Sequence, residues 1–243
     1  MNPIIKRKGL TGFKSTVGNV LANVIRDASR NGNNYIEATG YTTFLYGERQ
    51  MNSIIAPAFH QNTDAMILEY PATRKTGTRN HNASRADYYC LCNKGRSNIY
   101  RLFVELKSSW QVLPLRDGFK MSNVKLYEKA CKQICGLINE FRGKNKKFYE
   151  GCPIMRASML TIAITSNPSR EYNLTKDDID DLIEKAWEEF SMNGEMNPNL
   201  IGFWKVDDDV RIEQEWENDD TRIHGILYVC HIMKPYRINS NHP

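Results

Sequence analysis

Residues 100–110, with the sequence YRLFVELKSSW, limit the possible folds of this chain more than any other stretch. Their aromatic and aliphatic content predicts a β-strand. Successive side chains of a strand point to opposite faces, so Glu105 and Lys107 share one face. A carboxylate and an ammonium group on an otherwise apolar strand either neutralise each other at a solvated end of the sheet or face a cleft and do chemistry.

Length and composition indicate an ordinary globular protein. The chain has 243 residues, of which 41% are hydrophobic and 25% charged, enough to bury a core in one domain. No apolar run approaches the roughly 20 residues of a membrane-spanning helix, and the N-terminal residues lack the apolar stretch of a secretory signal. Six cysteines without such a signal indicate reduced thiols. We therefore expect a cytoplasmic protein with no membrane partner.

Charge is distributed unevenly along the chain. Residues 1–150 contain 24 Lys and Arg against 11 Asp and Glu, a net charge of +13, whereas residues 151–243 contain 9 against 17, a net charge of −8. A basic part beside an acidic one is typical of proteins with a polyanion-binding face. The alternative is uneven surface charge with no partner.

Hydrophobic periodicity places helices and strands in an α/β order. Helices are predicted at residues 15–30, 42–56, 122–141 and from Thr175 onward. The Asn-Gly-rich residues 31–34 are expected to stop the first helix, and Pro57 is expected to end or kink the second. Strands are predicted at 65–70, 85–92, 99–108, 157–165, 202–206 and 225–233. A basic loop is expected at 71–84 and an acidic loop at 207–220. Together they predict one α/β domain, residues 1–243, with a central mixed sheet flanked by helices, an N-terminal helical segment (about 1–60) and an acidic C-terminal part (about 170–243).

Glu48 lies on the apolar stripe of the second predicted helix, in line with Phe44, Met51 and Ile55. A carboxylate on a burial-facing stripe must be paired, hydrogen-bonded or metal-bound, because stranding it costs several kcal/mol. The alternative is a slightly rolled helix that lets Glu48 reach solvent.

The strands 85–92 and 99–108 are joined by a short polar stretch and predict an antiparallel hairpin. If Cys92 lies opposite Ile99, then Asp87 lies opposite Val104. If the register is shifted by one, Asp87 lies opposite Glu105 on the same face. Turn chemistry leaves both registers open, and both bring the two acids close together.

Glu48, Asp87 and Glu105 beside Lys107 form a set with a clear chemical use. Carboxylate oxygens, a backbone carbonyl such as that of Leu106, and several waters are ligands that Mg²⁺ prefers. A bound metal ion lowers the pKa of a water and offsets charge that builds on a phosphate. A lysine can orient that water or stabilise the phosphate oxygens.

Asp87 followed after a hairpin by Glu105-Leu106-Lys107 resembles the active-site signature of the PD-(D/E)xK nuclease superfamily, with similarity over about residues 42–141. The resemblance implies a restriction-endonuclease-like fold, with Asp87 and Glu105 as metal ligands and Lys107 as the catalytic lysine. Glu48 matches the acid that many members carry on the preceding helix. Gln133 is similar in placement to a polar residue on the following helix.

Two positions depart from the family pattern. Ala86 stands where the signature often has Pro, and Leu137 stands where one subgroup has a Tyr after the polar helix residue.

The leading hypothesis is a metal-dependent DNA endonuclease that uses Mg²⁺, with Mn²⁺ as a substitute, in a restriction, phage or mobile-element setting. Catalytic residues would be Glu48, Asp87, Glu105 and Lys107, and the metal would be held by Asp87, Glu105, the Leu106 carbonyl and Glu48. To cut both strands, a homodimer is possible. The residues expected to contact DNA are Arg74, Lys75, Arg79, Arg85, Lys94, Arg96, Lys129, Lys132 and Gln133.

Other hypotheses remain. The chain could be a catalytically idle nuclease-fold protein that only binds DNA, or a scaffold or inhibitor that contacts a partner through its acidic part. The Glu105–Lys107 pair could also be a surface ion pair worth less than ~1 kcal/mol. Cys90 and Cys92 lack a second cysteine pair to complete a zinc site, and no Gly-rich phosphate loop supports nucleotide hydrolysis.

Overall fold

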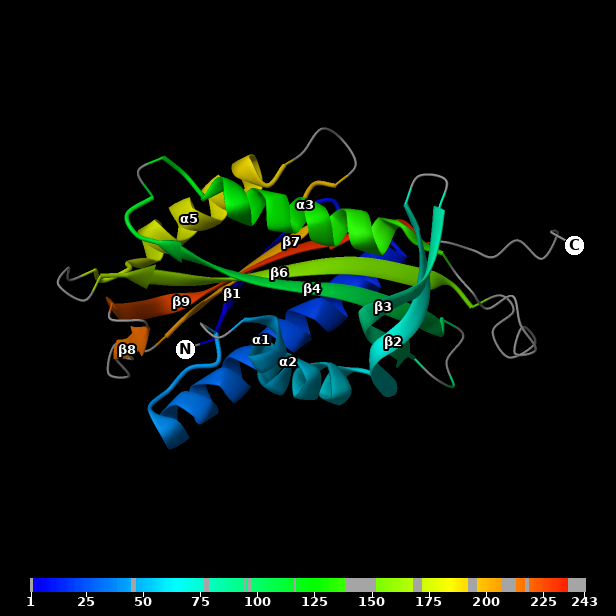
Figure 1. The fold of residues 1–243 in the computed structure, drawn as a ribbon, viewed down its shortest axis with the longest axis horizontal. Helices are drawn as coiled ribbons and strands as arrows, with labels where there is room; N and C mark the ends of the chain where they lie inside the picture. Colours follow the sequence, from blue (N-terminus) through cyan, green and yellow to red (C-terminus); the bar gives the residue numbers. More distant parts are fainter. Residues whose placement is uncertain are drawn as a thin grey trace, which may run out of the picture.

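The fold is taken from a computed structural model, which describes residues 2–44, 47–76, 79–93, 95, 98–115, 117–138, 152–167, 172–191, 196–206, 213–216 and 219–235. These residues form a nine-stranded sheet with helices on both faces (Figure 1). The strands lie in the order β1-β7-β9-β6-β4-β3-β2-β5, and β8 pairs with β9. They are β1 (Ile4–Arg7), β2 (Ala65–Thr76), β3 (Arg79–Cys92), β4 (Tyr100–Val112), β5 (Leu137–Ile138), β6 (Ile154–Ser166), β7 (Leu200–Lys205), β8 (Glu213–Trp216) and β9 (Asp219–Ile232).

The sheet is mixed, as predicted. Strands β4 and β6 run parallel, and every other pairing among the described strands is antiparallel. Strand β6 lies between β4 and β9, and most of its side chains are buried. This matches the nearly continuous apolar run that predicted a central strand there.

Helices α1 (Phe13–Thr39) and α2 (Glu48–Asn62) cover one face of the sheet, and α3 (Met121–Cys135) and α5 (Lys176–Glu189) cover the other (Figure 1). One core therefore lies between the sheet and α1 with α2, and a second between the sheet and α3 with α5. The Thr175 start of α5 was predicted correctly, since Thr175 and Asp178 form a capping box. None of the helices formed by the described residues is both long and apolar enough to cross a membrane.

The boundaries of α1 and α2 differ from the prediction. Helix α1 does not stop at residues 31–34 but continues to Thr39, where Gly40 takes a left-handed backbone with φ 72°. Gly32 lies inside the helix, and a larger residue would not fit there because its Cβ would come within 2.8 Å of the Phe44 ring. Helix α2 starts at Glu48 rather than at 42, and it continues through Pro57 to Asn62, with Ala58 and Phe59 beyond the proline buried in the core.

The predicted loop at 71–84 was also wrong. Strands β2 and β3 pair from Ala65 with Leu91 as far as Thr76 with Arg79, which makes one long hairpin at the end of the sheet (Figure 1). Tyr70 stacks on the ring of Tyr89 at a centroid distance of 4.6 Å, and this packing outweighs the loop-forming preference of the local sequence.

The predicted helix at 122–141 ends early. Helix α3 stops at Cys135, and the following Leu137 is buried in β5, which pairs with β2. Burial of Leu137 in a strand, rather than in one more helical turn, explains why its position fitted the apolar stripe. Strands β1 and β8 were not predicted, and β8 lies in the stretch expected to be an acidic loop.

Candidate active site

The candidate site lies where the β3–β4 ladder ends and the two strands separate, a place that we call the fork. The ladder between these strands runs from Cys92 opposite Tyr100 to Tyr88 opposite Val104, and the next position along each strand is Asp87 and Glu105. The structure therefore adopts the second of the two registers. Beyond this point β4 continues beside β6, and the Leu106 N–H donates a 2.7 Å hydrogen bond to Asp87 Oδ2.

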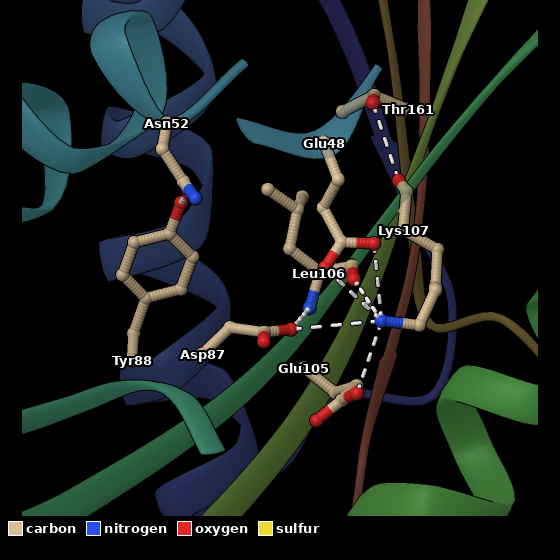
Figure 2. A network of polar contacts seen from close by, with 8 residues as sticks. All are labelled: Glu48, Asn52, Asp87, Tyr88, Glu105, Leu106, Lys107 and Thr161. Carbon is tan, nitrogen blue, oxygen red and sulfur yellow. Dashed lines mark hydrogen bonds and ion pairs between the residues drawn. The ribbon is translucent and has the colours of Figure 1, made fainter. Parts of the chain in front are cut away.

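The ammonium group of Lys107 is the centre of this fork (Figure 2). Its Nζ lies 3.0 Å from Glu105 Oε1, 3.2 Å from Glu48 Oε2 and 3.8 Å from Asp87 Oδ2. It also donates a 2.6 Å hydrogen bond to the carbonyl oxygen of Leu106, so the side chain folds back onto its own strand. We call Glu48, Asp87, Glu105, Lys107 and the Leu106 carbonyl the Lys107 cluster. Three elements supply it: the start of α2, strand β3 and strand β4.

Glu48 is the most exposed side chain of the Lys107 cluster. The side chains of Glu105, Lys107 and Asp87 are 2%, 10% and 14% exposed, whereas that of Glu48 is 37% exposed. Glu48 therefore combines features of both sequence interpretations: it contacts Lys107 from the first turn of α2 and also reaches solvent.

The charges of the Lys107 cluster do not cancel. Burial raises the pKa of Asp87 to about 7, the negative charge of Glu105 adds to this effect, and Lys107 and the Leu106 N–H oppose it. Burial by itself lowers the pKa of Lys107, but Glu105, Asp87 and Glu48 together raise it above its ordinary value. The three acids thus carry more negative charge than one ammonium neutralises, and the site favours an additional proton or cation.

A divalent cation fits the chemistry of these donors. In the described part of the chain, no three His, Cys, Asp or Glu side chains are grouped closely enough to hold one metal ion. In the Lys107 cluster, the three carboxylates contact the ammonium group of Lys107. Mg²⁺, however, needs only one or two carboxylates and retains several waters. Asp87 and Glu105, with the carbonyl of Leu106 that follows Glu105 on β4, supply this set, and the surplus negative charge provides the attraction.

Contacts around the Lys107 cluster hold its members in place, and sequence reasoning missed them. Tyr88, next to Asp87, donates a short hydrogen bond from its hydroxyl to Asn52 of α2 (Figure 2). The Tyr88 ring also stacks on Phe59 at a centroid distance of 4.6 Å. Asn52 is four residues after Glu48 and so lies on the same helix face, a spacing that could have drawn attention to it. On the opposite side, Thr161 of β6 donates to the carbonyl of Lys107 at 3.2 Å.

The structure describes only some of the residues predicted to bind DNA. Arg85 is exposed on β3, 3.5 Å from Glu69, and Lys129 and Lys132 are exposed on α3, where Lys132 pairs with Glu128. Gln133 is partly buried on the same helix. The side chains of Arg74, Lys75 and Arg79, together with Lys94 and Arg96, lie outside the part of the chain whose side chains are described, as do the basic residues at 142–147.

Several cysteine and histidine side chains away from the Lys107 cluster are buried in the protein interior. Cys90 and Cys92 are free and buried on β3, and burial raises the pKa of both thiols. His224 is buried against the hydroxyl of Ser166, 2.7 Å from its Nε2, and His231 bonds through Nδ1 to the carbonyl of Asn197.

A scan against protein-family models and searches of curated proteins and of solved structures find no match to this chain. Its function is therefore inferred from the geometry and charge of the Lys107 cluster.

Proposed function

We propose that this protein is a metal-dependent deoxyribonuclease that hydrolyses phosphodiester bonds of DNA at the Lys107 cluster. The observation that supports the proposal most is the convergence of Glu48, Asp87 and Glu105 on one lysine at the fork between β3 and β4. Asp87 and Glu105 follow Glu48 by 39 and 57 positions in the sequence, yet all three meet at Lys107. An isolated surface ion pair does not require such a convergence. The mixed sheet, the hairpin and the flanking α2 and α3 are consistent with a restriction-endonuclease-like fold and with the PD-(D/E)xK superfamily.

Each member of the Lys107 cluster has a role in the proposed reaction. Asp87, Glu105 and the Leu106 carbonyl would hold Mg²⁺, or Mn²⁺ in its place. Such an ion supplies a water of lowered pKa and offsets the negative charge of the phosphate. Lys107, whose raised pKa keeps it protonated, donates hydrogen bonds to the phosphate oxygens as charge builds on them. Glu48, 3.2 Å from the ammonium and the most exposed of the three acids, would orient Lys107 and add a carboxylate ligand for the ion.

Further parts of the proposal concern the setting. Cleavage within a strand rather than from its end, and a restriction, phage or mobile-element role, follow from the resemblance alone. A single cluster cuts one strand, so cleavage of both strands is expected to need a homodimer.

The test is the nicking of supercoiled plasmid DNA. With Mg²⁺ or Mn²⁺ the wild-type protein is expected to produce nicked and then linear DNA, and a chelator is expected to stop it. Lys107→Met should lower the rate by roughly 100-fold or more, since one donor to developing charge has about that effect. Lys176→Met, at an exposed position of α5, is the matched control and should cleave normally. Absence of cleavage with either metal, or full activity of Lys107→Met, would refute the proposal.

A second candidate is an idle nuclease-fold protein that binds DNA without cutting it. The observation that favours it is that all three carboxylates contact Lys107. The ammonium group thus neutralises part of their negative charge without a metal ion. This candidate predicts binding that weakens steeply with salt and no strand cleavage in either metal.

A further inference from the structure

Trp110 is a large aromatic side chain on the surface of β4. It is 54% exposed, whereas Trp187 and Trp204 are 5% and 1% exposed. An isolated apolar residue at a surface needs no explanation by itself. Trp110, however, lies on the same strand as Lys107, and a positively charged side chain lies over its ring.

Trp110 follows Lys107 by three residues, which is about 10 Å along a strand at roughly 3.3 Å per residue. This part of β4 lies beyond the end of the β3–β4 ladder, and in the described structure its ladder partner is β6. By the alternation of side chains, Trp110 leaves β4 on the face opposite to Lys107, the face on which Leu106 packs in the core with α1 and α2. Glu48 contacts Lys107 from the first turn of α2, so Trp110 lies on the same side of the sheet as this more exposed member of the Lys107 cluster.

The backbone on which Trp110 stands is firmly held. Its carbonyl accepts a hydrogen bond from Asn123 Nδ2, and that same amide donates to the buried side chain of Gln111. Gln111 Oε1 in turn accepts from the backbone N–H of Lys120. These contacts join β4 to the start of α3 and give the exposed ring a fixed base, which lowers the entropy lost when a ligand stacks on it.

A positive charge accompanies the ring. Lys120 Nζ lies 5.4 Å from the centroid of Trp110, within the range of a cation–π contact. An aromatic face for a base and an ammonium for a phosphate are the two groups that single-stranded nucleic acid requires of a protein surface.

We propose that Trp110 stacks on an unpaired nucleobase while Lys120 contacts the adjoining phosphate. The preferred substrate of the Lys107 cluster is then DNA with unpaired nucleotides next to the cleaved bond, because bases within a duplex have both faces covered by their neighbours. This inference rests on the proposed nuclease function and adds the substrate class to it.

The same surface could instead contact protein, since Val112 of β4 is also exposed. Two features favour a nucleotide. The position of Trp110 along the strand that carries Lys107 links it to the site of phosphate chemistry, and the ammonium of Lys120 over its ring complements a polyanion.

Binding is tested without cleavage, by titrating short oligothymidylate into the full-length protein in the presence of a chelator and following tryptophan fluorescence. The wild-type protein should show quenching, because a stacked base lies against the exposed indole. Trp110→Phe should lose most of the quenching yet retain part of the affinity, and Trp110→Ala should bind on the order of 5- to 150-fold more weakly, as expected for loss of one stacked base. Tyr35→Ala, an exposed aromatic position on α1, is the control and should match the wild type.

Cleavage rates distinguish this inference from the proposed function. Trp110→Ala should lose the preference for a substrate with a single-stranded segment over a matched duplex, with circular dichroism unchanged. Equal preference and equal quenching in the wild type and Trp110→Ala would overturn the inference while leaving the nuclease proposal intact. Absence of metal-dependent cleavage in every variant would refute the nuclease proposal, and the fluorescence titration would still decide whether Trp110 stacks on bases. A wild-type dimer that Trp110→Ala converts to a monomer, without quenching by oligothymidylate, would show that the surface binds protein and overturn the inference.

Discussion

Replacing Asp87 by Asn should make the protein more stable at neutral pH while removing its proposed activity. In the folded protein burial and Glu105 raise the Asp87 pKa from 3.8 to about 7. Between these two pH values the unfolded chain has released its proton and the folded chain has kept it, so stability falls as pH rises. Above about pH 7 both states are ionised, and the full cost of holding the buried charge is present.

The size of this cost follows from the shift. A difference of about three pKa units at about 1.4 kcal/mol per unit gives roughly 4 kcal/mol. Asn has no charge to bury and its side-chain oxygen can still accept from the Leu106 N–H. Asp87→Asn should therefore exceed the wild type in free energy of unfolding by up to about 4 kcal/mol near pH 8 and match it near pH 4.

Chemical denaturation at a series of pH values measures this difference. Asp181→Asn, at an exposed position of α5, shows the effect of removing one surface carboxylate. Adding Mg²⁺ near pH 8 should stabilise the wild type, by about 2.7 kcal/mol at one hundred times the dissociation constant, but leave Asp87→Asn nearly unchanged. An Asp87→Asn variant that is less stable than the wild type near pH 8, or a difference that does not vary with pH, would refute the reasoning.

Three further substitutions test the surroundings. Tyr88→Phe removes the hydroxyl that bonds to Asn52 and should cost about 1 kcal/mol in denaturation, with a lower cleavage rate at unchanged DNA affinity; an unchanged rate would show that this contact does not position the site. Gly225→Ala should destabilise the sheet by about 1–3 kcal/mol, because its Cβ would lie 2.4 Å from the Trp204 carbonyl, and a normal melting temperature would contradict this packing. Thr175→Ala removes the α5 capping box and should cost about 1 kcal/mol, which a thermal melt can check.

Much of the site could be predicted because it depends on local patterns. The composition of β4 predicted a strand, and the alternation of side chains along it placed Glu105 and Lys107 on one face. Asp87 was predicted to lie close to Glu105 because a hairpin links its strand to β4. Strand β6 and the start of α5 were likewise predicted from a continuous apolar run and from a capping pattern.

Other features depend on contacts between distant segments. The observed register pairs Tyr88 with Val104, both buried in the core beside α1 and α2, and turn chemistry alone does not reveal this pairing. Gly32 suggested the end of a helix, but it provides room for Phe44. The β2–β3 hairpin is stabilised by aromatic stacking of Tyr70 on Tyr89, which no property of residues 71–84 reveals.

The pairing of Tyr88 with Asn52 was missed for a related reason. Neither residue is charged, so neither stood out in a search for acids and bases. Their contact joins α2 to β3 and thereby holds Glu48 near Asp87.

The most direct test of the proposed metal site is a crystal of the protein soaked with Mn²⁺ and measured for anomalous scattering. The proposal predicts a peak between Asp87 and Glu105, at ligand distance from both carboxylates and from the Leu106 carbonyl, and loss of that peak in Glu105→Gln. Crystals of a protein that cleaves DNA with Mn²⁺ but shows its anomalous peak elsewhere, with Lys107 still paired to all three carboxylates, would contradict it.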